Sequence, residues 1–362
     1  MPQIPVARPK LPVAERIAPY LKAIDAARYY SNFGPLVSSL EERIAAHYGL
    51  PAGTVATLAN ATWGLTLALA AQGAKPGTLC VMPAWTFVAS AHAAVNAGLI
   101  PYFIDVDPET WALESATVLD EIRRAPAPVG AVMPVFPFGR PISVAAWDAL
   151  RSETGLAVVI DAAAGFDSLT PGETPTVVSL HATKVLATGE GGFVLSTDRS
   201  IVGEVRKRSN FGFSGTRQAS VAATNAKLSE YHAAVGHAAL DEWSNIRADW
   251  IRAATAYREI IESPIHLQSG FGDAWIASTC LLRTPDSAVT RIERGLAAEG
   301  IDTRRWWGRG AHAHPATANY PRTPLPVTEA LANSTIGLPF YRDIESVTIG
   351  QVARILYATL EE

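Results

Sequence analysis

The sequence predicts an α/β protein with a mostly parallel β-sheet that is sandwiched by helices. From Val55 onward, short runs rich in β-branched residues alternate with runs that have apolar residues at helical spacing. At 362 residues the chain is also long enough to bury a large core and to form two domains. Such alternation gives right-handed βαβ units, which bind ligands where the parallel strands end.

The N-terminal part is expected to be an arm followed by helices. Residues 36–48 have apolar side chains at helical spacing, which predicts a helix there. The turn-rich run before it, residues 29–35, contains three aromatic residues. This aromatic loop either covers a ligand or a partner subunit, or is held against the core by its own side chains.

The remaining elements follow from the same patterns. Strands are expected at residues 55–58, 79–82, 101–106, 129–135, 157–160, 177–180 and 192–196, with helices at 62–72, 87–97, 115–124 and 144–154. After residue 242 we expect long helices at 239–262 and 288–299, a strand at 275–283, a loop-rich stretch at 304–326 and a last helix at 349–360. The change in pattern after residue 242 predicts a large domain over residues 1–242 and a smaller α+β domain over 243–362.

Composition excludes several classes of protein. The net charge is −4 and no basic patch or tail occurs, so nucleic acid is not an expected partner. The apolar runs are too short to span a bilayer, and the N-terminus lacks a signal-peptide pattern. Cys80 and Cys280 lie in apolar surroundings, as expected of buried thiols in a reducing compartment. We therefore expect a cytoplasmic enzyme without a membrane partner.

The stretch that points most directly to function is residues 179–192, SLHATKVLATGEGG. Among the six lysines of the chain, Lys184 is the one in an apolar strand–loop beside glycines. Desolvation disfavours an ammonium group and lowers its pKa, which makes the amine useful as a nucleophile toward a carbonyl cofactor. The alternative is a lysine that extends its charged tip from a strand end into solvent.

Polar and aromatic residues follow the other predicted strands. Thr62 is placed to cap the helix that follows, whose first N–H groups could also bind a phosphate. Trp85 either stacks on a flat ring or packs in the core. Asp161 follows four apolar residues, so it needs a partner such as a protonated pyridine nitrogen, unless it caps the next turn. Ser179 ends a strand and can offer its hydroxyl to a phosphate.

Together these groups match the needs of one cofactor, pyridoxal 5′-phosphate (PLP). It requires a lysine for its aldehyde, an acid for its ring nitrogen, an aromatic side chain for its ring face and a helix N-terminus for its phosphate. No zinc-like His/Cys cluster, no Walker lysine motif and no G-x-G-x-x-G after a strand occurs. We therefore expect PLP and no metal, and a nicotinamide oxidoreductase is disfavoured.

At this point the chain resembles the DegT/DnrJ/EryC1/StrS aminotransferases, a family of PLP-dependent enzymes that act on nucleotide-linked keto-sugars. The resemblance implies the fold type I architecture, with a seven-stranded sheet in its large domain. It covers nearly the whole chain, in the order in which the family has its motifs. The matching segments are 32–35 (NFGP), 60–62 (NAT), 83–89 (PAWTFVA), 161–163 (DAA), 179–184 (SLHATK), 189–192 (GEGG), 210–212 (NFG), 225–230 (NAKLSE) and 338–340 (LPF).

The resemblance implies roles for the cofactor residues. Lys184 would form the Schiff base with PLP and move the proton between C4′ and the substrate carbon. Asp161 would keep the ring nitrogen protonated, and Trp85 would stack on the ring. The phosphate would be bound by the backbone of Ala61 and Thr62 and by the hydroxyl groups of Thr62 and Ser179.

The resemblance also implies a homodimer with shared active sites. Asn225 matches an asparagine that reaches the cofactor phosphate in the neighbouring subunit. The aromatic loop, with Tyr30, Asn32 and Phe33, falls where the family meets its nucleotide-sugar.

One position departs from the family pattern. Ala164 stands where the family has glutamine or, in some sugar 4-aminotransferases, histidine. That side chain contacts the cofactor ring and its 3-hydroxyl. A water or another polar group, such as His181, could substitute for it. Residues 165–167, Gly-Phe-Asp, also replace the usual run of small residues.

The expected reaction is a two-stage transamination for polysaccharide or glycoside biosynthesis. An amino acid, L-glutamate by the resemblance, gives its amino group to a nucleotide-linked 4-keto-6-deoxyhexose. Alternatives are a 3-keto-sugar acceptor, a catalytically silent family member that acts as a binding or regulatory protein, and an amino-acid-cleaving enzyme of the same fold type.

Overall fold

The computed structural model describes residues 4–285 and 288–361 of the chain. Its strands are β1 (Val55–Leu58), β2 (Leu79–Pro83), β3 (Ile100–Ile104), β4 (Val129–Val132), β5 (Ala157–Val158), β6 (Ile160–Asp161), β7 (Thr176–Ser179), β8 (Gly192–Leu195), β9 (His266–Leu267), β10 (Cys280–Arg283) and β11 (Thr335–Leu338). Each predicted strand from residue 55 to residue 196 is present, with ends that shift by a few residues.

One strand joins two smaller sheets into a single large one. The two have the orders β3-β2-β4-β5 and β1-β8-β7-β6. Val159 alone separates β5 from β6, and its N–H donates to the carbonyl of Val132 at 3.0 Å. β5 and β6 are therefore segments of one strand that both four-stranded sheets share. The result is the predicted seven-stranded sheet, in the order β3-β2-β4-β5/β6-β7-β8-β1.

The strand directions bring the strand ends of interest to one edge of this sheet. β8 runs antiparallel to β7 and to β1, whereas the other neighbouring strands pair in parallel. The carboxyl ends of β1, β2, β4, β6 and β7 consequently lie at the same edge, which is where parallel sheets bind ligands.

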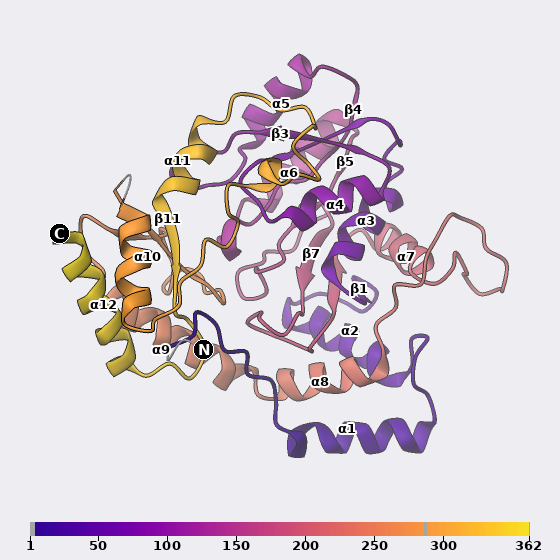
Figure 1. Cartoon of the computed structure of the whole chain (residues 1–362). Helices are drawn as coiled ribbons and strands as arrows, with labels where there is room; N and C mark the ends of the chain where they lie inside the picture. Colours follow the sequence, from indigo (N-terminus) through magenta and orange to yellow (C-terminus); the bar gives the residue numbers. More distant parts are fainter. Residues whose placement is uncertain (1–3, 286–287, 362) are drawn as a thin grey trace.

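Helices cover both faces of the sheet (Figure 1). Those from the first two thirds of the chain are α1 (Ala14–Ala27), α2 (Pro35–His47), α3 (Ala61–Ala71), α4 (Val88–Asn96), α5 (Ser115–Arg124), α6 (Val144–Thr154), α7 (Arg199–Arg208) and α8 (Glu230–Asp241). Consecutive strand residues point to opposite faces. Val81 and Val158 accordingly join a core with α2, α5, α6 and α8, whereas Cys80 and Ala157 join a second core with α3, α4 and α7.

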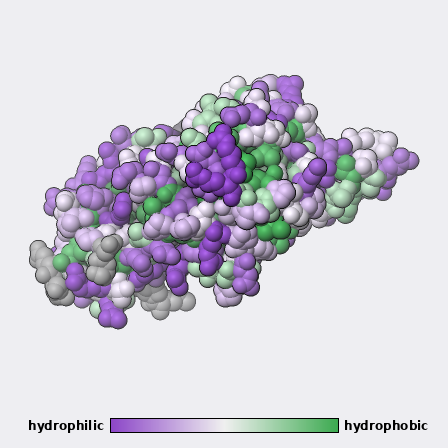
Figure 2. Space-filling view, turned by 90° about the horizontal axis from the view of Figure 1, so that it is seen from above, coloured by the Kyte–Doolittle hydropathy of each residue, from purple (hydrophilic) through white to green (hydrophobic). Residues whose placement is uncertain are grey.

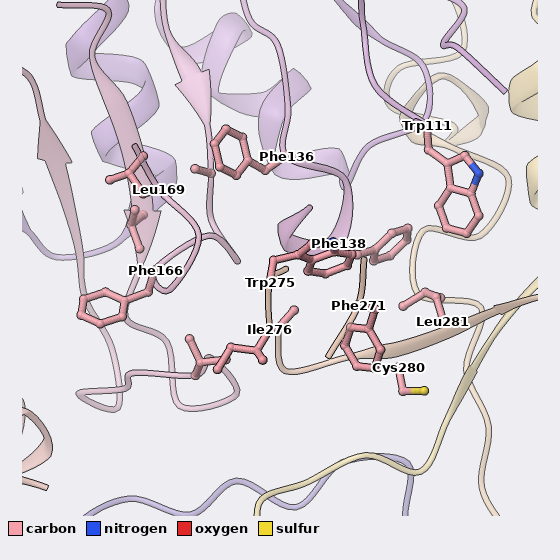
Figure 3. Close-up of a cluster of buried hydrophobic side chains, with 14 of the residues drawn as sticks. Trp111, Phe136, Phe138, Phe166, Leu169, Phe271, Trp275, Ile276, Cys280 and Leu281 are labelled. Atoms are coloured by element: carbon pink, nitrogen blue, oxygen red, sulfur yellow. The ribbon is translucent and has the colours of Figure 1, made fainter. Parts of the chain in front are cut away.

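The C-terminal part adds an antiparallel sheet, β11-β10-β9, and further helices. These helices are α9 (Trp243–Arg258), α10 (Ala288–Ala298), α11 (Pro326–Ser334) and α12 (Ser346–Glu361). Figure 3 shows Phe138, from the loop after β4, close to Phe271 and Trp275 of this part, and all three belong to one hydrophobic core. One hydrophobic core thus extends across the predicted boundary at residues 242 and 243, and the division into two domains stays a prediction.

Two predictions for this part were wrong. The single helix expected at residues 239–262 is two helices, because Glu242 (φ −99°, ψ 5°) interrupts it between α8 and α9. Trp243, the next residue, is buried and packs edge-on against Phe166 with ring centroids 4.8 Å apart. The strand expected at 275–283 is confined to β10. Trp275 and Ile276, earlier in the predicted range, are buried in a loop, where Trp275 forms only an isolated bridge with Phe271.

The N-terminal arm crosses to the C-terminal part of the chain (Figure 1). Hydrogen bonds hold the main chain of the arm at Ile4 and Val6. Ile4 N donates to Gly300 O (3.2 Å), Asp302 N donates to Ile4 O (2.9 Å), and Phe340 N donates to Val6 O (3.0 Å). Residues close to the beginning of the chain therefore pack beside residues close to its end.

The surface is mixed, and Figure 2 shows hydrophilic residues interspersed with hydrophobic ones on the face seen from above. None of the helices in the described ranges has both the length and the apolar character needed to cross a membrane. Cys80 and Cys280 are buried free thiols, and burial raises the pKa of each.

Candidate active site

A cavity of about 600 Å³ opens at the carboxyl edge of the large sheet. This volume lies within the range of small-molecule sites. The cavity is lined by most of the residues predicted to act together: Lys184, Asp161, Ala61, Thr62, Ser179 and His181. These residues come from the ends of β1, β6 and β7, so the sheet directions explain why they meet.

Lys184 lies in the tight loop that connects β7 to β8. Lys184 N donates to His181 O (2.9 Å), and Ala182 N donates to Gly189 O (2.8 Å), which closes the loop across the glycine cluster. Gly189 has a φ of +95°, in the left-handed region that favours glycine. The glycines therefore shape the loop that directs the lysine to the cavity.

Lys184 is half-buried and lines the cavity. Burial lowers the pKa of this amine from its ordinary value, and the Asp161 carboxylate partly opposes the shift. A lowered pKa increases the fraction of neutral amine, the form that attacks a carbonyl carbon.

Asp161 is buried, with 6% of its surface exposed, and its carboxylate is held in place by two donors. Ser90 Oγ donates to Oδ2 (2.7 Å), and Ala163 N donates to Oδ1 (3.1 Å). Ser90 Oγ in turn lies 2.9 Å from Thr86 Oγ1. Burial raises the pKa of Asp161, while these hydrogen bonds and the Lys184 charge act in the opposite direction. Sequence reasoning missed Ser90, since a serine in a helix has no distinctive pattern.

The N-terminus of α3 faces the same cavity. Thr62 was predicted to be its N-cap, and this is wrong. Asn60 is the cap, because its backbone is extended (φ −165°, ψ 167°) and its side chain accepts from Trp63 N at 2.9 Å. Thr62 lies inside the first turn. The N–H groups of Ala61 and Thr62 come before the N–H of Trp63, which Asn60 caps.

The last glycine of the GEGG cluster, Gly192, packs directly against this turn. A Cβ at Gly192 would lie only 2.6 Å from Ala61 N and 2.9 Å from Ala61 Cα. Glycine at this position therefore lets the start of β8 approach the N-terminus of α3. The anion-binding end of α3 and the lysine loop are brought together by this contact.

Ser179 and His181 line the cavity between these two features. Ser179 is 8% exposed, and its Oγ accepts from His181 N at 3.2 Å. The His181 ring has its Nδ1 2.9 Å from Thr183 Oγ1 and its Nε2 3.7 Å from a Glu190 carboxylate oxygen. Whether His181 replaces the polar group missing at Ala164 stays a prediction.

Trp85 does not line the cavity, contrary to the expectation that it stacks on a cofactor. Its side chain is 2% exposed and packs edge-on against Phe138 and Trp307, with ring centroids 6.2 and 5.5 Å away. Phe87, two residues later, is 56% exposed and lines the cavity. Both residues are aromatic, so the sequence could not separate the core residue from the one that reaches the ligand space.

The remaining predicted residues lie away from the cavity of their own chain. Tyr30, Asn32, Phe33 and Asn225 are not among the described residues that line it. The Tyr30 ring is 6.3 Å from the Tyr231 ring, and the Phe33 ring lies 4.1 Å from the Arg206 guanidinium carbon. Asn225 Oδ1 accepts from Lys227 Nζ at 2.6 Å, and Asn32 is exposed. Their predicted contacts with the substrate and with a neighbouring site stay predictions.

The cavity wall beside Ala164 is apolar. Phe136, Phe138 and Ala164 line the cavity together, and the Phe138 ring stacks on Trp307 at 3.6 Å between centroids. The main chains of Gly139 and Ala164 lie close together, because a Cβ at Gly139 would be 2.8 Å from Ala164 O. Hydrophobic packing therefore surrounds the position at which the family pattern has a polar side chain.

These groups fit PLP. One cavity brings together an amine with a lowered pKa, a buried carboxylate held by hydrogen bonds, a helix N-terminus for a phosphate and a serine hydroxyl. The close approach of Gly192 to Ala61 leaves the helix end next to the lysine loop, as this ligand requires. In the described ranges, no group of three or more His, Cys, Asp or Glu side chains is placed to hold a metal ion.

Comparison with known proteins decides the family. The model of the DegT/DnrJ/EryC1/StrS aminotransferase family matches residues 13–357. The chain belongs to this family. Its cofactor is PLP.

Curated relatives of this aminotransferase are named for different activities. Protein Rv3402c of Mycobacterium tuberculosis is 32% identical over all of the chain and 90% of the relative. The dTDP-4-amino-4,6-dideoxy-D-glucose transaminase of Shigella dysenteriae is 30% identical over 70% of the chain and 69% of the relative. The UDP-N-acetyl-3-dehydro-alpha-D-glucosamine 3-aminotransferase of Acidithiobacillus ferrooxidans is 28% identical over 93% of the chain and 91% of the relative.

Among solved structures, the fold matches that of DesI, crystallised with its TDP-sugar product. The TM-score is 0.87 at 31% sequence identity, and the match covers 98% of this chain and 92% of DesI. The fold type I assignment of this aminotransferase is thereby confirmed.

Proposed function

We propose that this aminotransferase moves an amino group from an amino acid, L-glutamate, to a nucleotide-linked 4-keto-6-deoxyhexose. The observation that supports this most directly is the convergence of Lys184, Asp161, Ser179 and the N-terminus of α3 in one cavity. The product, an amino sugar on its nucleotide carrier, would serve polysaccharide or glycoside biosynthesis.

Bound PLP supplies an electron-withdrawing ring that stabilises negative charge on the adjacent substrate carbon. The chain supplies the acid and base. Lys184 Nζ would hold the cofactor in the resting protein. When a substrate takes its place, this amine would move a proton between the substrate carbon and the cofactor, from the donor carbon in the first half of the reaction and to the acceptor carbon in the second. Burial lowers the pKa of this amine, which increases the share of the neutral form that can accept a proton. Asp161, held by Ser90 and Ala163, keeps the ring nitrogen protonated.

The other end of the cofactor is held by the phosphate. The N–H groups of Ala61 and Thr62 and the hydroxyl of Ser179 are the donors for this anion, and the dipole of α3 favours negative charge there. Phe87 is the aromatic side chain that would cover the ring face, in place of Trp85, because it is exposed to the cavity.

Attack at C4 of the sugar is supported by the Shigella relative, whose name is dTDP-4-amino-4,6-dideoxy-D-glucose transaminase. The Acidithiobacillus relative is named as a 3-aminotransferase, so a 3-keto-sugar is the second candidate. The apolar wall at Phe136, Phe138 and Ala164 suits an acceptor whose reacting end has lost a hydroxyl group, as a 6-deoxy sugar has.

We further propose a homodimer with shared active sites. Tyr29, Tyr30, Phe211 and Tyr231 are large aromatic side chains that are 44–50% exposed on one chain. Asn225 lies next to Phe211 along this surface, since Phe211 N donates to Thr224 O at 3.0 Å. A partner subunit that covers these aromatic residues would place its cofactor phosphate near Asn225 of this chain.

The deciding experiment incubates the purified holoenzyme with L-glutamate and a panel of nucleotide-linked 3-keto and 4-keto sugars. Mass spectrometry identifies the sugar that gains an amine, and NMR locates the carbon. The Lys184→Ala variant is the control and should give no product. If glutamate yields no 2-oxoglutarate even in a single turnover, the proposed amino donor is wrong. If 2-oxoglutarate forms but no sugar is aminated, the proposed acceptor is wrong.

The silent binding protein remains the contrasting hypothesis, and Ala164 is the reason for it. It predicts a purified protein that gains no cofactor absorbance when PLP is added. An aminotransferase predicts a cofactor band that disappears in Lys184→Ala.

A further inference from the structure

The cavity has a second wall, made by the N-terminal arm and by the segments around residues 304 and 341. Four basic side chains line this wall: Arg8, Lys10, Arg304 and Arg342. Among the described lining residues, the acidic ones are Asp161 and Glu190, which both belong to the Lys184 end. The second wall therefore has an excess of positive charge next to the cofactor residues.

The arm also has main-chain anchors that do not involve these charges. Its main chain is anchored at Ile4 and Val6 by the hydrogen bonds to Gly300, Asp302 and Phe340 described above. These anchors precede Arg8 and Lys10 in the chain. The two cationic side chains can therefore change partners while the arm stays in place.

Arg8 and Lys10 share one counter-ion, Asp343. Arg8 Nη2 lies 2.9 Å from Asp343 Oδ1, and Lys10 Nζ lies 3.8 Å from Oδ2. The side chains of Arg8, Lys10 and Asp343 are 54%, 49% and 40% exposed, so both pairs are of the weak, solvent-screened kind. Asp343 is not among the described residues that line the cavity, whereas both cations are. An anion that enters the cavity could therefore compete with Asp343 for them.

Further contacts restrict the positions of the Arg8 and Arg342 side chains. The Arg8 guanidinium lies over the Tyr341 ring, with its central carbon 4.6 Å from the ring centroid, which limits its freedom. The Arg342 side chain is only 11% exposed, with Nη2 3.2 Å from Asp249 and Nη1 donating to Lys10 O at 3.3 Å. Its buried Nε has no hydrogen-bond partner among the described residues. Arg342 is thus a fixed guanidinium with unused donor capacity.

We infer that Arg8, Lys10, Arg304 and Arg342 form the subsite for a doubly charged anionic group of a substrate, and that Asp343 holds Arg8 and Lys10 until this anion arrives. Either the two carboxylates of the amino donor or the diphosphate of the sugar carrier has this chemistry. The inference rests on the proposed function only in that both proposed substrates are anionic.

The test measures binding without turnover, by titration calorimetry on the PLP-loaded protein at low ionic strength. Glutarate is the probe for a dicarboxylate, and inorganic pyrophosphate is the probe for a diphosphate. Arg8→Gln should weaken binding of the recognised probe by about tenfold, the loss of one charge-assisted hydrogen bond. Asp343→Asn should instead strengthen it by roughly two- to fivefold, because it removes the competing carboxylate.

These opposite directions separate a binding role from a structural one. If the Arg8–Asp343 pair only fastened the arm, both variants would weaken binding, and that result overturns the inference, as does failure of both probes to bind the parent protein. Asp120→Asn is the matched control, since it breaks an exposed ion pair of 2.8 Å with Arg123 outside the cavity. It should change neither affinity. A response confined to glutarate identifies the donor, and one confined to pyrophosphate identifies the carrier.

The outcome is independent of the proposed reaction. Transfer of nitrogen from glutamate to a keto-sugar by the parent protein tests the reaction, whether or not the variants respond. A protein that aminates a sugar but shows no opposite effects of Arg8→Gln and Asp343→Asn refutes only the anion subsite.

Discussion

Trp85 and Phe87 are separated by one residue, yet they serve different purposes. Trp85 fills the core between Phe138 and Trp307, and Phe87 reaches the ligand cavity. A buried indole stabilises the fold through the area that it removes from water, whereas an exposed ring can contribute only when a ligand covers it. The two residues therefore offer a matched pair for separating stability from cofactor binding.

We expect Trp85→Ala to lower the free energy of unfolding by about 3–5 kcal/mol, because it leaves a cavity in the core. Phe87→Ala should change that free energy by no more than about 0.5 kcal/mol. It should weaken PLP binding instead. Urea unfolding of the cofactor-free proteins and titration of PLP absorbance measure the two effects. If Trp85→Ala left stability intact and abolished PLP binding, the stacking role would return to Trp85.

Lys184 should destabilise the cofactor-free protein, because burial lowers its pKa below the ordinary value of 10.5. Below the folded-state pKa the amine is charged in both states, and the folded state bears the full cost of burial. As the pH rises toward the unfolded value, the unfolded chain binds more protons than the folded one, so stability increases. We expect Lys184→Met to be more stable than the parent at about pH 7, with the difference shrinking toward about pH 10.

The exposed Lys75 provides the control for this measurement. Lys75→Met should have little effect on unfolding at either pH, because its side chain is hydrated in both states. A constant difference between Lys184→Met and the parent across the pH range would contradict the assigned pKa shift.

The site residues could be predicted from the sequence where burial of the residue type is energetically costly, so that only a function explains its presence. Lys184 and Asp161 are charged groups in apolar runs, and the structure brings both to the cavity. Phe87 and Ser90 were not predictable in this way, because exposure of an aromatic ring and the partner of a helix serine depend on neighbours far away in the sequence.

Helix α3 joins folding to cofactor binding through its first turn. Asn60 caps the helix, and it also lines the cavity. Asparagine and aspartate are equally good caps, but only aspartate adds a negative charge where a phosphate is expected to bind.

Asn60→Ala should therefore lower the free energy of unfolding by about 1 kcal/mol, since it removes the cap. Asn60→Asp should keep the stability and weaken PLP binding, because its carboxylate repels the phosphate. Thermal or urea unfolding of the cofactor-free variants, with PLP titration alongside, distinguishes the two. Equal PLP affinity in Asn60→Asp and the parent would argue against a phosphate at this helix end.

The element boundaries show where local patterns stop being informative. Helix α3 begins one residue earlier than predicted, and α5 and α6 lie where they were expected. The break between α8 and α9 was missed because residues 239–262 contain neither glycine nor proline. The chain turns there so that Trp243 can pack on Phe166, a contact between distant segments that periodicity does not reveal.

The assembly of the molecule determines whether one chain is sufficient for activity. We expect Lys184→Ala and Asn225→Ala to be strongly impaired as separate proteins. If the sites are shared, each mixed dimer has one site with both native residues, so mixing the two variants should restore activity. The measurement is turnover after joint unfolding and refolding. Failure to recover activity, with mixed dimers demonstrated by mass spectrometry, would place the complete site within one chain.

The architecture as a whole was accessible from the sequence, because alternating strands and helices leave few right-handed arrangements. The mostly parallel sheet and the position of its ligand edge follow from that rule, whereas the seven-stranded sheet was implied by the family resemblance. The surroundings of the cavity were not accessible in the same way. The arm and the segment at 339–343 meet only in the folded chain, and nothing in either sequence marks the other as its neighbour.

The docking of the arm also constrains the order of events during protein synthesis. Ile4 and Val6 leave the ribosome long before their partners, Gly300 and Phe340, are made. The arm must therefore wait, without these partners, until residue 340 has emerged. Contacts of such long sequence separation form late in folding. We expect the sheet and the Lys184 loop to fold first, and the cavity to acquire its cationic wall only after residue 340 has been made.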